Sequence, residues 1–335
     1  MSNVDLRNEH EAVRTRVGFH DFTHEMLEVK GPDAGAFLDK MFVNNISGSD
    51  VGEGQYTTML NESGIIIDDV IIFRMEDDLY WVSTLYIQEM FDWFGKYSDG
   101  FDVEFTDIKH VTTMYAVQGP KSADVINDFL DENIDDLNFS RIRDNTVGDV
   151  PVRIARFGFT GELGYELYFH PDHVELIEEK LLESGKSVGI KKLETDVVLS
   201  SLPSEKGYIL MRDVDELNPV EAGLGWTVDW DSDFVGKSAI ESSKGNPKRS
   251  LIGFTVDNDT EVELESDIKK DGEVVGKVTN CAYGFTVDEM IGYCIIDNAK
   301  AKIGDKVTIG DDNVAATLTE RVFYDPEDER RRGVA

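Results

Sequence analysis

The sequence predicts an α+β body followed by a smaller, β-rich C-terminal domain. In the first three quarters of the chain, apolar residues at helical spacing are interspersed with strand-like runs. From Leu251 onward only short β runs remain, separated by glycine and aspartate turns. The change follows a polar stretch, residues 242–249, that contains glycine, proline and clustered positive charge. With 335 residues, the chain is long enough for two or three hydrophobic cores.

Each expected element of the body has a local signal. Apolar residues at helical spacing predict helices over residues 9–18, 33–41, 121–130 and 173–183, the second capped by Asp33. Strand-like runs cover residues 26–31, 54–60, 64–75, 79–85, 111–118, 152–157 and 164–169. Gly-Pro pairs end the first and fifth of these strands, and a turn at residues 61–64 joins the second to the third. The last two strands are expected to pair.

The composition is strongly acidic. Asp and Glu number 67 against 33 Lys and Arg, for a formal net charge of −34. A nucleic-acid-binding surface needs the opposite balance, so we expect no nucleic-acid partner. No apolar stretch approaches the roughly 18 residues of a membrane span, and the polar start lacks a secretory apolar region, so we expect a cytoplasmic protein without a membrane partner. The acid excess is spread along the whole chain, which favours adaptation to a salt-rich cytoplasm over an ordinary acidic protein.

Motifs for metal or nucleotide chemistry are absent from the sequence. The six histidines and the two cysteines, Cys281 and Cys294, do not fall at trusted metal-ligand spacings, so no metal site is expected. There is neither a Walker A loop nor a dinucleotide-binding fingerprint.

An aspartate pair interrupts one apolar strand. Asp68 and Asp69 divide the run III-DD-VIIF, and neighbouring residues in a strand point to opposite faces. One carboxylate must therefore face the apolar side unless the strand bulges, and such a carboxylate needs a hydrogen-bond or charge partner. A functional site, where local rules are often broken, and a solvated bulge or strand end fit this pattern equally well.

Two glycine-rich segments have both a structural and a functional interpretation. Residues 157–166, FGFTGELGYE, contain three glycines, which permit close approach of the backbone to a ligand, although composition alone favours a hairpin turn. Residues 218–226, NPVEAGLGW, favour a tightly packed structural corner, with Pro219 in the first turn of a short helix and Trp226 packed against the glycines.

In this order, the segments resemble the glycine-cleavage T-protein (aminomethyltransferase) family. QYTTMLNESGIIIDDVIIFRM (55–75) looks like the family's strand–turn–strand signature, and RTRVGFHDFTH (14–24) resembles its R-x-x-x-G-hydrophobic-x-D-hydrophobic-S-H segment. AVQGPKS (116–122) is similar to its QGP corner, and FGFTGELGYELYF (157–169) to its TGYTGE-x-G segment. NPVEAGLGWTV with DFVGKSAI (218–240) resembles its P-x-E-x-x-L-x-W and F-x-G-K/R-x-A segments. The collinear matches cover nearly the whole chain.

The resemblance implies a three-domain, cloverleaf-like fold with tetrahydrofolate in a central hole. We expect a first folate-binding domain from residues 1–25 and 111–213, and a second α+β domain from residues 26–110 and 214–248 that carries the Asp-Asp strand. Residues 249–335 are expected to form a C-terminal β-barrel. The implied activity moves a methyl or aminomethyl-derived methylene unit from an amine, sulfur or oxygen donor to tetrahydrofolate. The expected partner is a small-molecule donor, or a lipoyl carrier protein if the chain is a true T-protein.

The family's site residues match particular positions of this chain. Asp69 matches the catalytic carboxylate near the reactive folate nitrogens, where it stabilises positive charge at the one-carbon centre. Glu166 matches the acid that holds the pterin amino groups, since both carboxylate oxygens can accept hydrogen bonds. The other positions that the resemblance assigns to folate binding are Tyr56, Phe73, Ser83, Phe159 and Tyr208.

The chain also departs from the family pattern. Phe159 stands where the family has Tyr, Ser83 where it has Asn, and Pro203 where it has one of the arginines that support folate's glutamate tail. The family segment that precedes residues 9–14 is largely absent, and EKGY (205–208) is closer to the folate domains of sarcosine- and dimethylglycine-oxidising enzymes. These departures are shared in part with folate-dependent demethylases. The alternatives are a folate-binding protein without transferase activity, of the iron–sulfur assembly type, and a degenerate member.

Overall fold

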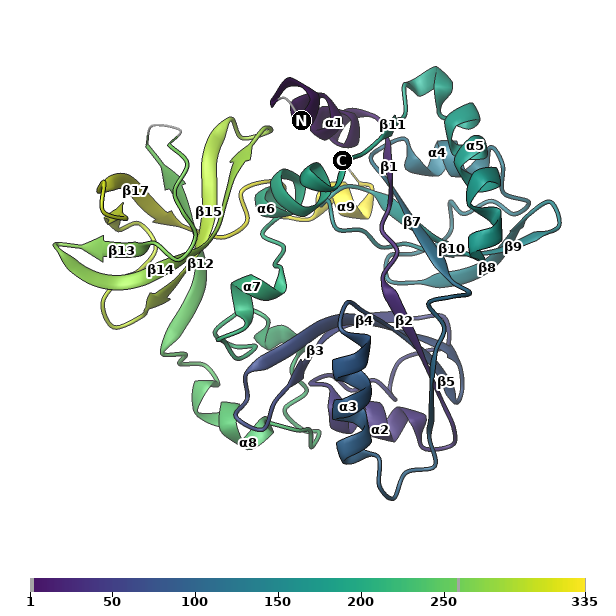
Figure 1. Ribbon diagram of the computed structural model, residues 1–335, viewed down its shortest axis with the longest axis horizontal. Coiled ribbons are helices and arrows are strands. Elements are labelled where there is room, and N and C mark those ends of the chain that lie inside the picture. Colours follow the sequence, from purple (N-terminus) through teal and green to yellow (C-terminus); the bar gives the residue numbers. More distant parts are fainter. Residues whose placement is uncertain (1–2, 258–259, 335) are drawn as a thin grey trace.

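The computed structural model describes residues 3–257 and 260–334, which form three β-sheets around the middle of the molecule (Figure 1). One sheet has six strands in the order β11-β1-β7-β10-β9-β8, and another has five in the order β3-β4-β5-β2-β6. The six strands β12-β15-β14-β13-β16-β17 close into a barrel. The expected α+β architecture with a C-terminal β-barrel is confirmed.

The six-stranded sheet is built from segments far apart in the sequence. Strand β1 pairs in parallel with β11 and antiparallel with β7, so the chain leaves this sheet after β1 and returns at β7. Strands β9 and β10 pair antiparallel, as expected for the two runs around FTGEL. The strands are β1 (Gly18–Asp21), β7 (Thr113–Gln118), β8 (Ile142–Val147), β9 (Val150–Ala155), β10 (Gly164–Phe169) and β11 (Lys191–Lys192). The accompanying helices are α1 (Asn3–Thr15), α4 (Ser122–Asn127) and α5 (Val174–Ser184), with 3-10 turns at Pro171–His173 and Lys186–Val188.

The five-stranded sheet lies between β1 and β7 in the sequence. Helices α2 and α3 cover one of its faces and share a core with it, because their apolar residues recur at helical spacing. The strands are β2 (Glu25–Lys30), β3 (Gly54–Leu60), β4 (Ile66–Glu76), β5 (Leu79–Thr84) and β6 (Glu104–Asp107). The helices are α2 (Ala34–Met41) and α3 (Ile87–Tyr97).

The connection to the barrel returns along the edge of the five-stranded sheet. Ile66 N donates to Leu217 O over 2.9 Å, and Asp229 N donates to Val43 O over 2.7 Å. Its elements are a π-helix (Val197–Ser201), α6 (Leu202–Lys206), α7 (Met211–Val214), a 3-10 turn (Gly225–Thr227), α8 (Lys237–Ile240) and a 3-10 turn (Glu241–Ser243). The barrel strands are β12 (Arg249–Val256), β13 (Asp267–Lys270), β14 (Glu273–Gly284), β15 (Glu289–Asp297), β16 (Lys306–Ile309) and β17 (Val314–Thr319), followed by helix α9 (Glu329–Arg332).

Several elements differ from the sequence prediction. Helix α1 starts at Asn3 and stops at Thr15, because the following residues form β1. Helix α3 and strands β1, β6 and β8 were not expected. Asp33 lies at the N-cap of α2 but makes no side-chain cap; its carboxylate instead accepts from Asp102 N over 2.9 Å. The boundaries expected between the three domains stay a prediction.

The two open sheets face each other through the sides that their helices leave uncovered. Buried residues of the five-stranded sheet, including Met26, Phe73 and Trp81, share one core with Phe157 and Tyr168 of the other sheet region. Side chains on these inner faces therefore point toward the middle of the molecule. Among the described residues, no helix combines the length and the apolar character needed to span a membrane.

Candidate functional site

Strand β4 directs its two aspartates to opposite faces of the five-stranded sheet. Val70 and Ile72 belong to the core under α2 and α3, whereas Ile71 and Phe73 face the other sheet. Because side chains alternate along a strand, Asp68 lies on the helix side and Asp69 on the inner side. Asp69 is therefore the member of the pair that can reach a ligand at the middle of the molecule.

Asp69 forms a hydrogen-bonded pair with Tyr56 of the neighbouring strand. Tyr56 lies opposite Ile71 in the β3–β4 register, so its ring stands on the same inner face, and Tyr56 Oη donates to Asp69 Oδ2 over 2.9 Å. Burial raises the pKa of Asp69 to about 6, although the bond from Tyr56 opposes that shift. Burial and the neighbouring carboxylate raise the pKa of Tyr56 well above its usual range, so the phenol keeps its proton.

Asp68 is the carboxylate that faces the apolar side. It is only 2% exposed, and Thr84 Oγ1 donates to its Oδ2 over 2.6 Å. Burial raises its pKa to about 7. The solvated-bulge interpretation is therefore wrong for Asp68, since the hydroxyl of Thr84 supplies the partner that a buried carboxylate needs.

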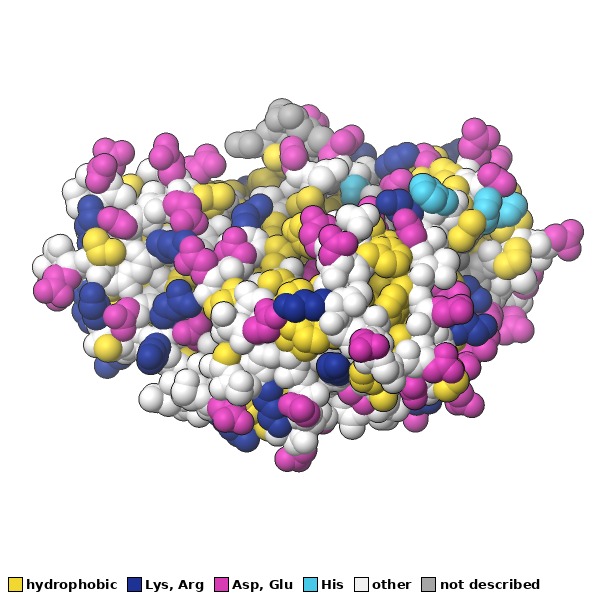
Figure 2. Space-filling view, turned by 60° about the horizontal axis from the view of Figure 1, so that its bottom comes forward, with side chains coloured by type: hydrophobic (Ala, Val, Ile, Leu, Met, Phe, Trp, Pro, Cys, Tyr) yellow, Lys and Arg dark blue, Asp and Glu magenta, His cyan; other side chains and the backbone are white. Residues whose placement is uncertain are grey.

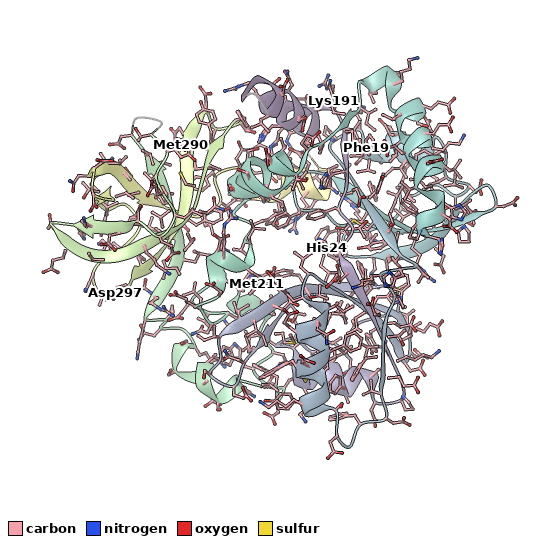
Figure 3. The ribbon with its side chains drawn as sticks, viewed as in Figure 1. Phe19, His24, Lys191, Met211, Met290 and Asp297 are labelled. Carbon is pink, nitrogen blue, oxygen red and sulfur yellow. The ribbon has the colours of Figure 1, made fainter. Side chains whose placement is uncertain are left out.

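Ser83 lies on the inner face beside a histidine that the sequence analysis did not single out. Ser83 is opposite Ile71 in the β4–β5 register, and its Oγ shares a hydrogen bond of 2.8 Å with His24 Nδ1. Burial lowers the pKa of His24 to about 4, so the ring is neutral at pH 7. Figure 3 shows His24 and Met211 of α7 on opposite sides of the space between the three sheets.

Phe73 has a packing position rather than a site position. Its ring is 0% exposed and makes edge contacts with Phe157 and Tyr168, at centroid distances of 5.4 and 5.8 Å. These contacts fill the core between the two sheets. In this structure Phe73 supports the site from behind and offers no surface to a ligand, which corrects the expected direct contact.

Glu166 approaches the middle from the opposite sheet. It lies on β10, is 4% exposed, and accepts a hydrogen bond of 2.7 Å from Tyr168 Oη. Burial raises the pKa of Glu166 to about 7. A buried carboxyl with one protein partner has acceptor capacity left for a ligand that presents N–H groups.

Phe159 and Tyr208 form an aromatic stack with Phe22. The ring centroids of Phe159 and Tyr208 are 5.5 Å apart with planes at 20°, and those of Phe22 and Phe159 are 6.2 Å apart at 24°. Tyr208 follows Gly207, whose φ of +77° in the left-handed region ends helix α6. The loss of a hydroxyl at Phe159 therefore leaves the stack intact.

Trp226 contradicts the expectation of a tightly packed corner. It is 73% exposed and stacks on Tyr56, with ring centroids 6.3 Å apart and planes at 25°. An exposed tryptophan beside the Tyr56–Asp69 pair belongs to the rim of the site. No local pattern could indicate this, because the contact joins segments 170 positions apart in the chain.

A buried ionic cluster fixes the elements around the site. Arg14 Nη2 of α1 lies 2.8 Å from Glu205 Oε2, and Arg14 Nη1 lies 3.4 Å from Glu162 Oε1. Tyr324 Oη donates to the same oxygen of Glu162 over 2.7 Å, and the Arg14 guanidinium lies 4.1 Å from the Tyr324 ring centroid. Burial opposes ionisation of Glu205, but His10 and Arg14 outweigh it and lower the pKa of Glu205 to about 2.

Taken together, the inner faces carry groups suited to a planar heteroaromatic ligand with amino groups. Glu166 of the six-stranded sheet supplies acceptors, and the aromatic stack supplies a flat apolar surface. The Tyr56–Asp69 pair supplies a carboxylate from the five-stranded sheet. Among the described residues, no group of three or more His, Cys, Asp or Glu side chains has metal-binding geometry.

Comparisons with known proteins agree with this arrangement. Residues 3–232 match the family model of the GCVT N-terminal domain, and residues 249–325 match that of the glycine cleavage T-protein C-terminal barrel domain. The chain belongs to the glycine cleavage T-protein family. The resemblance drawn from the motifs is confirmed, and all seven expected site residues lie within the first matched range.

Curated members of the family match almost the entire chain. An aminomethyltransferase of Halothermothrix orenii is 35% identical over 325 residues, which cover 94% of this chain and 89% of the relative. The aminomethyltransferases of Alkaliphilus metalliredigens and Thermotoga petrophila are 32% and 30% identical, and cover 94% and 93% of this chain and 88% of each relative. The crystal structure of the glycine cleavage system aminomethyltransferase T of Bartonella henselae has a TM-score of 0.87 at 24% identity, over 96% of this chain and 90% of that one, which supports the shared three-part fold.

Proposed function

We propose that this chain is a tetrahydrofolate-dependent one-carbon transferase of the aminomethyltransferase type, with Asp69 as its catalytic carboxylate. Family membership supports the activity class, and the hydrogen-bonded Tyr56–Asp69 pair on the inner sheet face is the observation that carries the assignment. The folate supplies the nitrogen that accepts the one-carbon unit. Everything else in the reaction depends on how the chain's own residues bind, orient and hold charge.

Glu166 is proposed to orient the folate through its pterin amino groups. Its carboxyl is buried and aimed at the inner face, and its single described side-chain partner is the Tyr168 hydroxyl. Two roughly parallel hydrogen bonds from a pterin edge to one carboxylate fix both position and rotation. The stack of Phe22, Phe159 and Tyr208, with Ser83 across the space, supplies contact surface for the remainder of the ligand.

Asp69 is proposed to hold the positive charge that develops at the one-carbon centre. A carboxylate placed in advance near that charge stabilises the transition state without reorganising solvent. Tyr56 orients this carboxylate by donating to Oδ2, which leaves Oδ1 for the reacting groups. With its pKa at about 6, Asp69 is mostly ionised at pH 7 and also able to accept a proton.

For the donor, the names of the relatives favour an aminomethyl group, which a lipoyl carrier protein would present. The exposed ring of Trp226 beside Tyr56 gives an apolar rim that such an arm could pass. A demethylase acting on a small methyl donor is the second candidate, favoured by Ser83 and Phe159 in place of the usual Asn and Tyr. Ammonia release from an aminomethylated carrier separates the two. A cytosolic location is part of the proposal, supported by the free thiols of Cys281 and Cys294.

The substitution Asp69→Asn tests the catalytic assignment. We expect kcat to fall at least about 100-fold, because the amide cannot hold a proton or a full negative charge. The unfolding midpoint should not fall, since the amide oxygen still accepts from Tyr56 and the raised pKa of Asp69 means that its charge costs stability at neutral pH. In the wild-type enzyme, kcat/KM should decline as the pH falls below about 6, where Asp69 becomes protonated. Turnover is followed as methylenetetrahydrofolate formation, and as methyltetrahydrofolate for methyl donors.

Asp68→Asn is the matched control, since it makes the same chemical change one residue away on the opposite face of β4. It should keep turnover near the wild-type level. Equal losses in the two variants, or an unchanged kcat in Asp69→Asn, would contradict the role of Asp69.

The substitution Glu166→Gln tests the folate-binding assignment. Tetrahydrofolate affinity should drop at least about tenfold, since replacing a charged acceptor of two hydrogen bonds by an amide costs about 1.5–3 kcal/mol. Calorimetric titration in molar salt, under reducing and anaerobic conditions, measures the dissociation constant. Glu175→Gln, on the exposed side of α5, removes the same charge far from the inner face and should not alter it. Wild-type affinity in Glu166→Gln would remove Glu166 from the site.

A further inference from the structure

Arg321 extends from the segment that follows the last barrel strand to Ala222, in the connection that leads to the barrel. Phe323 N and Tyr324 N both donate to Glu205 O of α6, over 2.8 and 2.9 Å, which fixes the direction of this segment. Tyr324 is held further by the Arg14–Glu162 cluster. The backbone that carries Arg321 is thus held in place by several contacts. Arg321 lies outside the sequence motifs around the Asp pair and the TGE turn.

The guanidinium of Arg321 lies against glycine-containing backbone beside the candidate site. Its Nη1 donates to Ala222 O over 2.7 Å. The next residue, Gly223, has a φ of +74°, which favours glycine, and its Cα side faces the Arg321 guanidinium at ordinary contact distance. The core that contains Ala222 and Tyr293 also includes the partly buried ring of Tyr56.

Arg321 has no carboxylate partner in a chain with a large excess of carboxylates. Within residues 3–257 and 260–334, no Asp or Glu oxygen lies within 4.0 Å of its guanidinium nitrogens, and Ala222 O is its one hydrogen-bond acceptor. Burial lowers the pKa of Arg321 below its ordinary value. Arg14, which is more deeply buried at 5% exposed, has two carboxylates in contact. A partly buried guanidinium without an anion in contact keeps N–H donors available, and a ligand carboxylate can use them.

The position of Arg321 relates it directly to the catalytic pair. Burial and the Asp69 carboxylate raise the pKa of the Tyr56 phenol, and the positive charge of Arg321 lowers it. The other nearby carboxylate is Asp213, which attracts Arg321 without contacting it: its Oδ2 accepts from Leu210 N over 2.8 Å, and its buried Oδ1 has no hydrogen-bond partner among the described residues. Asp69 and Arg321 therefore place a negative and a positive group near Tyr56.

We propose that Arg321 is a carboxylate-binding residue of the central site. The inference rests on the proposed function. It adds to the site a planar guanidinium that can bind a carboxylate through paired N–H donors. Two ligands of this reaction class carry such a group. One is tetrahydrofolate, through its glutamate moiety, and the other is a one-carbon donor of the N-methyl amino acid class, whose charged nitrogen would face Asp69.

Four ligands distinguish these sources by calorimetric titration at fixed molar salt. Tetrahydrofolate is compared with tetrahydropteroate, which lacks the glutamate, and N,N-dimethylglycine with N,N-dimethylaminoethanol, which lacks the carboxylate. In Arg321→Gln, we expect affinity to fall at least about tenfold for the carboxylate-bearing member of one pair and to stay unchanged for its partner. Arg321→Lys should recover part of the loss, since it restores the charge without the paired donors.

Arg212→Gln is the matched control, because Arg212 is an exposed arginine of α7 and its loss changes the net charge equally. It should leave all four affinities unchanged. A loss confined to tetrahydrofolate assigns Arg321 to the folate tail, and a loss confined to dimethylglycine assigns it to the donor.

Equal affinities of the wild-type protein within both ligand pairs overturn the proposal, even if Arg321→Gln does not fold. An equal loss for tetrahydropteroate and tetrahydrofolate overturns it as well. The proposed function is tested separately by tetrahydropteroate binding to the folded wild-type protein. If tetrahydropteroate does not bind, the folate assignment itself fails. If it binds, but Arg321→Gln leaves the affinities for tetrahydrofolate and dimethylglycine unchanged, only the role of Arg321 fails.

Discussion

Asp68 and Asp69 are adjacent in the chain, and the alternation of side chains along β4 gives them different physical environments. Asp69 shares the inner face with Tyr56, where a ligand can use its charge. Asp68 is sealed beneath the helices, and its described side-chain partner is the neutral hydroxyl of Thr84. The same residue type therefore has a proposed catalytic role at one position and an energetic penalty at the next.

We expect Asp68→Asn to stabilise the protein at neutral and higher pH. Burial raises the pKa of Asp68 to about 7 in the folded state, against about 3.9 in the unfolded chain. The folded protein then binds more protons than the unfolded chain between these values, so stability falls as the pH rises through this window. The variant lacks that loss and can still accept from Thr84. Its unfolding free energy should exceed that of the wild type by roughly 1–3 kcal/mol at pH 8.

Urea denaturation at several pH values from 4 to 8 measures this difference. Asp149→Asn, at an exposed position between β8 and β9, should follow the wild-type curve throughout. A constant difference across the pH range would show that Asp68 does not titrate within it.

At the level of the elements, α6 joins α1, the barrel and the segment that follows β17. The carboxylate of Glu205 forms an ion pair with Arg14 of α1, and its Oε1 accepts from Thr286 N of a barrel loop over 2.6 Å. The backbone oxygen of Glu205 accepts two hydrogen bonds from the segment after β17. Lys206 forms a second buried contact, 2.7 Å from Asp328 Oδ1 near the C-terminus. The short helix therefore orients Tyr208 and Arg321 by joining the segments that carry them.

Glu205→Gln should destabilise the protein by roughly 3 kcal/mol at pH 7, because a buried Arg14 loses its closest anion. The pKa of Glu205 is lowered to about 2, so its contribution is complete above the unfolded value near 4.3 and is lost as the pH falls toward 2. The variant and the wild type should therefore converge in acid.

Chemical denaturation at pH 7 and pH 3 measures the difference in unfolding free energy between Glu205→Gln and the wild type. Glu216→Gln removes an exposed partner of Lys277 and should change stability by no more than about 1 kcal/mol at either pH. A Glu205→Gln effect as small as that of Glu216→Gln would mean that the cluster does not hold the elements together.

At the level of the whole molecule, the acidic residues cover the surface instead of forming one patch. Figure 2 shows Asp and Glu side chains over the visible face, with hydrophobic side chains gathered near its middle. A net charge of −34 on a chain of this size repels itself in the compact state. The same field repels an anionic folate, which makes a positive group inside the site more valuable for binding.

The melting temperature should therefore rise by several degrees between 0.1 M and 1 M KCl, as the screening length falls from about 10 Å to about 3 Å. Scanning calorimetry at fixed pH measures it. NaCl at the same ionic strength supplies the same screening and should reproduce most of the gain. A melting temperature that is independent of salt would indicate that the surface charges are already compensated by neighbouring cations.

Much of the site follows from short-range patterns in the sequence. The alternation in β4 indicates that one aspartate must face inward, and the motifs around Asp69, Tyr56 and Glu166 are recognisable in the amino-acid sequence alone. Phe73 could not be placed this way, because its burial depends on Phe157 and Tyr168 of the opposite sheet. Helix α3 was missed although Ile87, Met90 and Phe94 recur on one face.

Arg321 shows the limit of such patterns. Nothing near it in the sequence marks it as different from the exposed Arg332 or Arg212, since its partial burial and its backbone acceptor arise from a segment about 100 residues away. The surroundings of Arg321 are determined by long-range packing, about which a local sequence pattern carries no information.

The contacts of α6 with the residues that follow β17 also have a consequence for folding during synthesis. Arg14 leaves the ribosome long before Tyr324, whose ring covers it in the folded structure. Contacts between distant positions form slowly, and chains that wait for them expose apolar surface. A nascent chain can complete the five-stranded sheet early, but the parts around the middle cannot be fixed until the segment after β17 has been synthesised, so the site forms late and as one unit.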